Sequence, residues 1–191
     1  MNQNKISYGI YNIESEVNDF NTSDVSLDFI IPQDLIANWK KCGIISNFIA
    51  QYNAAHYHNP DHAISSLSTI TNELIENAIN CSDNNNTLIN ISLKSSHNVT
   101  LIETINTATN YGSDLMENLV TQLKNTDINT LLLSQIEAAS SDTNERLPGI
   151  GIINMIKTYE ADIGIKIDQL TPLNNYNIAV KMCIQNTHLG T

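Results

Sequence analysis

The chain has 191 residues, a length typical of one domain around a single core, and we expect one domain over residues 1–191. Its net charge of −11 argues against binding to nucleic acid or to a membrane, since both bind clustered Lys and Arg. The three cysteines form no CxxC pair and the polar N-terminus is not a signal peptide, which favours a cytoplasmic protein without disulfides.

The first half of the chain predicts two strands followed by two helices. A β-rich run closed by a proline predicts a strand over 26–31, and a segment over 6–13 is its candidate partner. Apolar residues at steps of three and four then predict one helix over 34–55 and another over 63–81. Between these helices lies the polar segment His56–Asp61.

The second half predicts hairpins around three more helices. Alternating apolar residues indicate paired strands over 87–93 and 99–105, and a polar stretch over 106–113 leads into a helix. The remaining predicted elements are helices over 114–124, 127–140 and 150–160 and strands over 163–167 and 176–184. This mixture predicts an α/β (α+β) two-layer sandwich, with helices packed on one mixed, mostly antiparallel sheet.

One candidate site lies on the second predicted helix. Glu73 and Asn77 are one turn apart and about 40° apart around the helix axis, beside its apolar stripe. Magnesium prefers oxygen ligands and keeps several waters, so Asn77 can serve as a metal ligand together with nucleotide phosphates. Glu73 can take a proton from a hydroxyl or a water. Two solvated residues at the edge of a helix explain the same spacing without any function.

A second candidate site is the Gly-x-Gly turn at Gly149 and Gly151, which runs directly into an apolar helix. Glycine admits positive φ angles, and the backbone N–H groups at a helix N-terminus favour an anion. Neither a Walker Lys-Ser/Thr nor a third dinucleotide-type glycine follows, so these two common phosphate loops do not apply.

These motifs resemble a known superfamily. The run NELIENAINCS (72–82) resembles the N box of GHKL (Bergerat-fold) ATPases and kinases, in the form of the anti-sigma-factor serine kinases, and PGIGIINMIK (148–157) resembles their G2 box. The segments 39–52 and 158–164 are similar to the SiaB-like regulators, which act beside STAS-domain proteins. The matched core covers residues 34–184, after an N-terminal strand region over 1–33.

The resemblance implies a Bergerat ATP-binding fold with Mg²⁺ and ATP as cofactors. It implies that Glu73 is the catalytic base, that Asn77 binds the metal, and that Gly149 and Gly151 contact the triphosphate. The expected function is that of a bacterial signalling regulator which phosphorylates or sequesters a STAS-type partner protein. A serine phosphatase or response regulator in the same pathway, and a homodimer, are left open.

The chain departs from the superfamily at the adenine-binding Asp-x-Gly-x-Gly box. Asn106 stands at the position of the aspartate, and both glycines are missing. An amide oxygen accepts a hydrogen bond from the adenine amino group more weakly than a carboxylate does. The alternative function is therefore a non-catalytic protein-interaction adaptor on the same fold, with a degenerate nucleotide site.

A third class of function is suggested by the histidines in HYHNPDHA (56–63), which superficially resemble the signature of HD-type phosphodiesterases. A metal-dependent hydrolase would use His58 and His62 as ligands. Such enzymes also need a downstream His-Asp pair, and the sequence has none. A solvated segment between two helices is the simpler interpretation.

Overall fold

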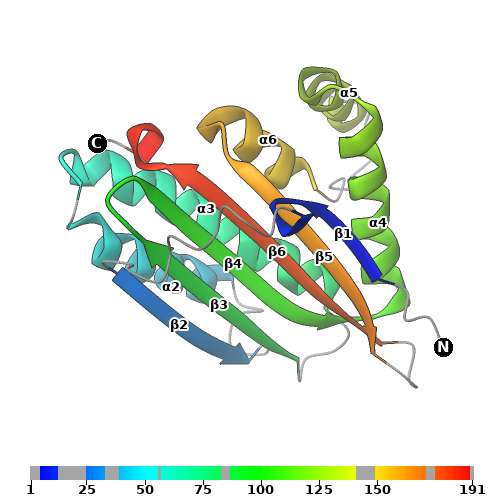
Figure 1. The fold of residues 1–191 in the computed structure, drawn as a ribbon, viewed down its shortest axis with the longest axis horizontal. Coiled ribbons are helices and arrows are strands. Elements are labelled where there is room, and N and C mark those ends of the chain that lie inside the picture. The colour runs from blue at the N-terminus through cyan, green and yellow to red at the C-terminus, as the bar shows by residue number, and fades with distance from the viewer. Residues whose placement is uncertain are drawn as a thin grey trace.

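A computed structural model describes residues 5–12, 25–32, 39–55, 57–82, 87–140, 149–170 and 175–189 (Figure 1). In these ranges one six-stranded sheet has the order β1-β5-β6-β4-β3-β2, and every neighbouring pair is antiparallel. The strands are β1 (Lys5–Gly9), β2 (Val25–Pro32), β3 (Leu88–Ser95), β4 (Val99–Ala108), β5 (Asp162–Leu170) and β6 (Asn175–Gln185).

Five α-helices among the described residues pack on this sheet and form the second layer (Figure 1). They are α2 (Trp39–Ala54), α3 (Pro60–Cys81), α4 (Asn110–Asn125), α5 (Ile128–Ser140) and α6 (Ile150–Tyr159), with short 3-10 helices η1 (Ile10–Asn12) and η3 (Asn186–Leu189). The predicted two-layer sandwich is thus confirmed, and the described sheet is wholly antiparallel, not mixed. None of the described helices is long and apolar enough to cross a membrane.

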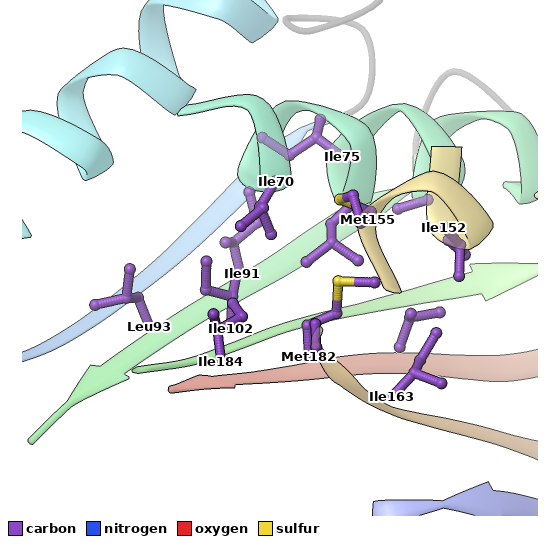
Figure 2. Packing of buried hydrophobic residues seen from close by; sticks show 14 of the residues in the cluster. Ile70, Ile75, Ile91, Leu93, Ile102, Ile152, Met155, Ile163, Met182 and Ile184 are labelled. Atoms are coloured by element: carbon purple, nitrogen blue, oxygen red, sulfur yellow. The ribbon is translucent and has the colours of Figure 1, made fainter. Parts of the chain in front are cut away.

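Helix α3 is the central helix of the second layer. It begins at Pro60, three residues earlier than predicted, because Asn59 accepts a hydrogen bond from the backbone N–H of His62 and proline suits the first helical position. Ile70 and Leu74 on its apolar stripe are fully buried. Figure 2 shows α3 and α6 contributing Ile70, Ile75, Ile152 and Met155 to a core completed by residues from the strands.

The two faces of the sheet differ in what covers them. On β4, Ile102, Thr104 and Asn106 are buried toward the helices, while the alternate residues are more exposed. On the other face, the hydroxyl of Tyr11 in η1 donates to Glu103, and Lys181 lies 3.4 Å from the same carboxylate. This cluster anchors η1 on the outer face.

Two predictions were wrong, one about the partner of the first strand and one about the segment between β4 and α4. The first strand pairs with β5 and not with β2, so it lies at the opposite edge of the sheet. It also ends at Gly9, where φ is +63°. The stretch 106–113 does not simply lead into a helix: β4 continues to Ala108, and the side chain of Thr109 then caps α4 by accepting from the N–H of Gly112.

Several predicted segments fall outside the described residues. They are the start of the first predicted helix (34–38), Ile13 at the end of the first predicted strand, His56, and Pro148 of the run that resembles the G2 box. The other predicted elements are present, with ends shifted by a few residues.

Gly112 sets how closely α4 approaches the end of α3. A Cβ atom on Gly112 would overlap the carbonyl oxygen of Cys81 and lie 2.9 Å from its carbonyl carbon. These are backbone atoms, so a side chain could not be accommodated by rotating a neighbour. Gly43, by contrast, lies on α2 with nothing within 4 Å of such a Cβ.

Gly112→Ala should therefore lower the free energy of unfolding by about 1–3 kcal/mol, the usual cost of overpacking. Gly43→Ala is the matched control and should raise it by roughly 0.5–1 kcal/mol, because alanine favours a helix. Urea unfolding followed by circular dichroism measures both changes. Equal stability of Gly112→Ala and the parent would show that the two helices are not held at this distance.

Candidate functional site

The five predicted site residues lie around the C-terminal half of α3. Glu73 and Asn77 are on α3 itself, and Asn106 is on the helix-facing side of β4. Gly149 is the N-terminal cap of α6, and Gly151 is in the first turn of that helix. Residues far apart in sequence are therefore gathered in one region between α3, β4 and α6.

The carboxylate of Glu73 lies directly against Gly151. A Cβ atom built on Gly151 would overlap Oε2 of Glu73 and lie 2.8 Å from its Cδ. A negative charge beside the first turn of a helix is favoured by the helix dipole. The glycine is thus needed for this close approach of a carboxylate, and any side chain here would displace Glu73.

Gly149 is needed for a different reason. Its φ of +89° lies in the left-handed region that side chains rarely adopt, and a Cβ there would lie 2.9 Å from Cδ1 of Leu119 on α4. As a glycine it offers no side-chain cap to α6. The two glycines of the predicted turn therefore have different roles. Gly149 adopts the backbone conformation of the turn, and Gly151 leaves space for the carboxylate of Glu73.

Asn77 is buried, with 8% of its surface exposed. Its Nδ2 donates to the backbone oxygen of Glu73, one turn earlier in α3, at 2.7 Å. With the amide in this orientation, Oδ1 accepts no hydrogen bond from the described residues. That oxygen is the atom which a hard cation such as Mg²⁺ would use.

Asn106 is held at the end of α3 by a short relay of hydrogen bonds. Its Nδ2 donates to Oγ of Ser82 at 3.1 Å, and the Ser82 hydroxyl donates to the backbone oxygen of Ala78 at 2.7 Å. The amide is buried, and its N–H₂ is directed at protein groups. Its Oδ1 accepts from none of the described residues, so this oxygen is the only part of the side chain that can serve a ligand.

The thiols near the site are protonated at neutral pH. Burial, followed by the nearby carboxylate of Glu76, raises the pKa of the Cys42 thiol to about 11. Burial alone raises the pKa of Cys81 to about 12. A thiol must be ionised to act as a nucleophile or as a soft metal ligand. Oxygen-based chemistry through Glu73 and Asn77 therefore fits this region better than thiol chemistry.

In the histidine segment, the tyrosine packs in the core and the described histidines do not. His58 is exposed, and His62 is exposed on the first turn of α3, whereas Tyr57 is buried and hydrogen-bonds Thr100 at 2.5 Å. Among the described residues, no group of three or more His, Cys, Asp or Glu side chains could hold a metal ion.

Two of the cavities in the described structure lie elsewhere. The larger, about 640 Å³, is lined by Tyr57, His58, the turn over 95–98 and the segment 185–187. The smaller, about 300 Å³, lies between η1, α4, α6 and β5. Neither is lined by any of the five predicted residues, so the carboxylate and amides near α3 are not part of either cavity.

The comparisons with known proteins add no relative. The chain matches no model of a known protein family, and it matches no curated protein. The resemblance to the GHKL superfamily therefore rests on the sequence motifs, and the function is a proposal built on the geometry around α3.

Two residues of the region escaped the sequence analysis. Ser82 connects Asn106 to α3, and Gly112 permits the contact between α4 and α3. Ser82 ends the run 72–82 that resembles the N box, but nothing in that run marks it for this contact, and the position of Gly112 carries no motif. Thr109, four residues after the strand was expected to end, was the available signal for the start of α4, since a threonine is a common N-cap.

Asn106→Asp tests the relay at the end of α3. The substitution places a carboxylate oxygen against Ser82 Oγ, whose hydrogen is already donated to Ala78, and should cost about 1–3 kcal/mol of stability at pH 7.5. Burial without a donor raises the pKa of this new carboxyl. The protein then loses stability as the pH rises through that pKa, so the deficit should shrink toward pH 4.

Urea unfolding at several pH values measures this difference. Asn90→Asp, an exposed change on the neighbouring strand β3, is the control and should stay within about 0.5 kcal/mol of the parent. An Asn106→Asp protein as stable as the parent at pH 7.5 would contradict the assigned orientation of the amide.

Proposed function

We propose that this chain is a bacterial signalling regulator that binds Mg-ATP and phosphorylates, or sequesters, a STAS-type partner protein. The observation that carries the proposal is the contact between the Glu73 carboxylate and Gly151 in the first turn of α6, with Asn77 one turn further along α3. It brings together a base, an amide oxygen and the start of a helix.

The charges at the start of α6 favour binding of a nucleotide that carries a divalent cation over binding of a nucleotide without one. A phosphate near the start of α6 gains from the backbone N–H groups there, since Gly149 supplies no side-chain cap. The same phosphate would be repelled by the Glu73 carboxylate. Oδ1 of Asn77 would hold a divalent cation bound with the nucleotide, and the positive charge of that cation would offset this repulsion.

Each residue then has one role. Glu73 accepts the proton of the partner's Ser or Thr hydroxyl, as a carboxylate that is partly exposed and reachable from solvent. Asn77 would hold the cation, which would supply positive charge for the transferred phosphoryl group. Gly151 keeps the backbone close enough for Glu73 to remain at the turn. The class of partner rests on the similarity of segments 39–52 and 158–164 to SiaB-like regulators.

The second candidate function is an adaptor without catalysis, and the surroundings of Asn106 favour it. The amide is only 3% exposed, and its N–H₂ is already hydrogen-bonded to Ser82. A glycine-dependent contact in this region is made by Gly112 with the backbone of Cys81, and this contact serves helix packing. On this alternative, the same sandwich acts through its surface alone.

Binding of Mg-ATP separates the two functions. Isothermal titration calorimetry should show binding of ATP that is lost when EDTA replaces magnesium, and Asn77→Ala should weaken it about tenfold or more, which is roughly 1.4 kcal/mol. Asn72→Ala is the matched control, because this amide on the same helix donates to Glu76. It should change the affinity less than about twofold. Absence of heat at millimolar Mg-ATP would favour the adaptor.

Phosphotransfer is tested separately, because a base acts mainly on the chemical step. Glu73→Gln should slow transfer of labelled phosphate from ATP to a STAS-type partner by about 10²-fold or more, while ATP affinity stays within a few fold. Glu76→Gln, one turn nearer the end of α3 and paired with Asn72, should retain transfer. Equal rates in Glu73→Gln and the parent would remove Glu73 from the mechanism.

A further inference from the structure

Helix α2 is apolar on two sides. Its inner side packs against α3, with Cys42 and Ile49 buried. Its opposite side carries Ile44, Phe48 and Tyr52 at steps of four residues, and these side chains are 67%, 53% and 56% exposed. We call these three residues the outer stripe. An amphipathic helix needs one apolar side to pack on its own sheet, so the outer stripe is left for another surface.

The strand beside the outer stripe is an edge of the sheet. All eight residues of β2 pair with β3, and among the described strands none pairs with the other side of β2 (Figure 1). The ring of Phe29 on β2 makes an edge-to-face contact with Phe48, with centroids 6.0 Å apart. On the other face of β2, Ile30 is 68% exposed.

An edge strand of this kind usually carries protection against pairing with other chains. Lysines, bulges and central prolines are the common devices. The eight residues of β2 contain one charge, at Asp28, and their proline is at the end of the strand. The strand pairs with β3 residue for residue, without a bulge. Its free side therefore offers backbone N–H and C=O groups, with Phe29 on the helix-facing side and Ile30, beside Asp28, on the other.

We propose that this edge is an interface between two copies of the chain. Strand β2 pairs antiparallel with β2 of a second copy across a twofold axis, and the two outer stripes pack together above the extended sheet. A twofold axis perpendicular to the sheet keeps both helix layers on the same side. Neighbouring strands are about 4.8 Å apart and packed helices about 10 Å apart, so one helix covers two strands and α2 of each copy reaches the other.

The contacts of Phe48 define the register. Phe48 is the middle residue of the outer stripe, so the twofold axis passes near it. Because the rings of Phe48 and Phe29 are in contact, the axis also passes near Phe29. Phe29 then faces Phe29 of the second copy, and Asp28 faces Ile30. This register keeps the two Asp28 carboxylates from lying directly opposite each other, where like charges destabilise a strand pair.

Area and charge fit a second copy. Each exposed side chain of the outer stripe and Ile30 adds about 100 Å² of apolar surface, so these four supply about half of the ~800 Å² per partner of a stable dimer, and the strand edge adds to this. The chain as a whole has a net charge of −11, which opposes self-association. The charged residues in α2 and β2 are only Lys40, Lys41 and Asp28, so the excess of acidic groups lies outside this interface.

Sedimentation velocity on the full chain tests the interface. At about 20 µM the parent should sediment as a dimer, with twice the 21.2 kDa of one chain. Ile44→Glu and Tyr52→Glu each place two carboxylates in the dimer contact and should raise the dissociation constant by about 100-fold or more. Both positions are exposed, so the variants should fold, which circular dichroism checks. Leu133→Glu, an exposed position on α5 (61%), is the matched control and should remain dimeric.

Disulfide cross-linking tests the register independently. Under mild oxidation, a mixture of Asp28→Cys and Ile30→Cys proteins should form a covalent dimer, because directly opposed residues lie within disulfide distance, whereas neither protein alone should do so. The parent controls for Cys42, Cys81 and Cys183. A parent that stays monomeric at about 200 µM, or a dimer that survives both glutamate variants, would overturn the proposal. Cross-linking of Ile30→Cys alone would overturn the register.

Discussion

The structure depends on the burial of one side of α3 against the antiparallel sheet. This 22-residue helix contacts β3 and β4 below it and α2, α4, α6 and η3 around it. Its buried residues include Leu67, Ile70, Leu74 and Ile75, each worth about 1.5–3 kcal/mol when removed from water. Because α2, α4 and α6 are placed against α3, the residues on its edges meet those neighbours at fixed positions.

Buried polar groups lie at both ends of α3, and they are satisfied in different ways. Near its start, Tyr57 and Thr100 hydrogen-bond each other, Thr100 donates to Oδ1 of Asn186, and Nδ2 of Asn186 donates to Ser96. Asn53 also donates to Tyr57, and every group of this network is satisfied except the buried Oδ1 of Asn53, which has no hydrogen-bond partner among the described residues. Near the end of α3, Asn77 and Asn106 donate to protein groups while their Oδ1 atoms accept from no described residue. Open acceptors of this kind suit a ligand.

Helix α2 connects the candidate site with the proposed interface. The Cys42 thiol on its inner side is close enough to the carboxylates of Glu76 and Glu73 for both to raise the thiol pKa. The residues of its outer stripe are spaced four apart along the helix, and the stripe lies beside the edge strand β2.

The sequence by itself determined the elements and the fold class. The 3.6-residue period of α3 and the alternation along β3 and β4 are local properties, so they report which side of each element is buried. The same periods placed Glu73 and Asn77 one turn apart. The Gly-x-Gly sequence also predicted a turn before α6, and the φ of +89° at Gly149 agrees with that expectation, whereas Gly151 lies within the first turn of the helix.

Only the tertiary structure decided which elements meet. The period of apolar residues shows which face of an element is buried, but it does not show which other element covers that face. The pairing of β1 with β5 could therefore not be predicted from the sequence of β1. The contact of Gly151 with Glu73, the approach of Gly112 to Cys81 and the hydrogen bond from Asn106 to Ser82 all join residues distant in sequence. Such contacts are set by the three-dimensional packing of α3 against its neighbours, and no local pattern of residues encodes them.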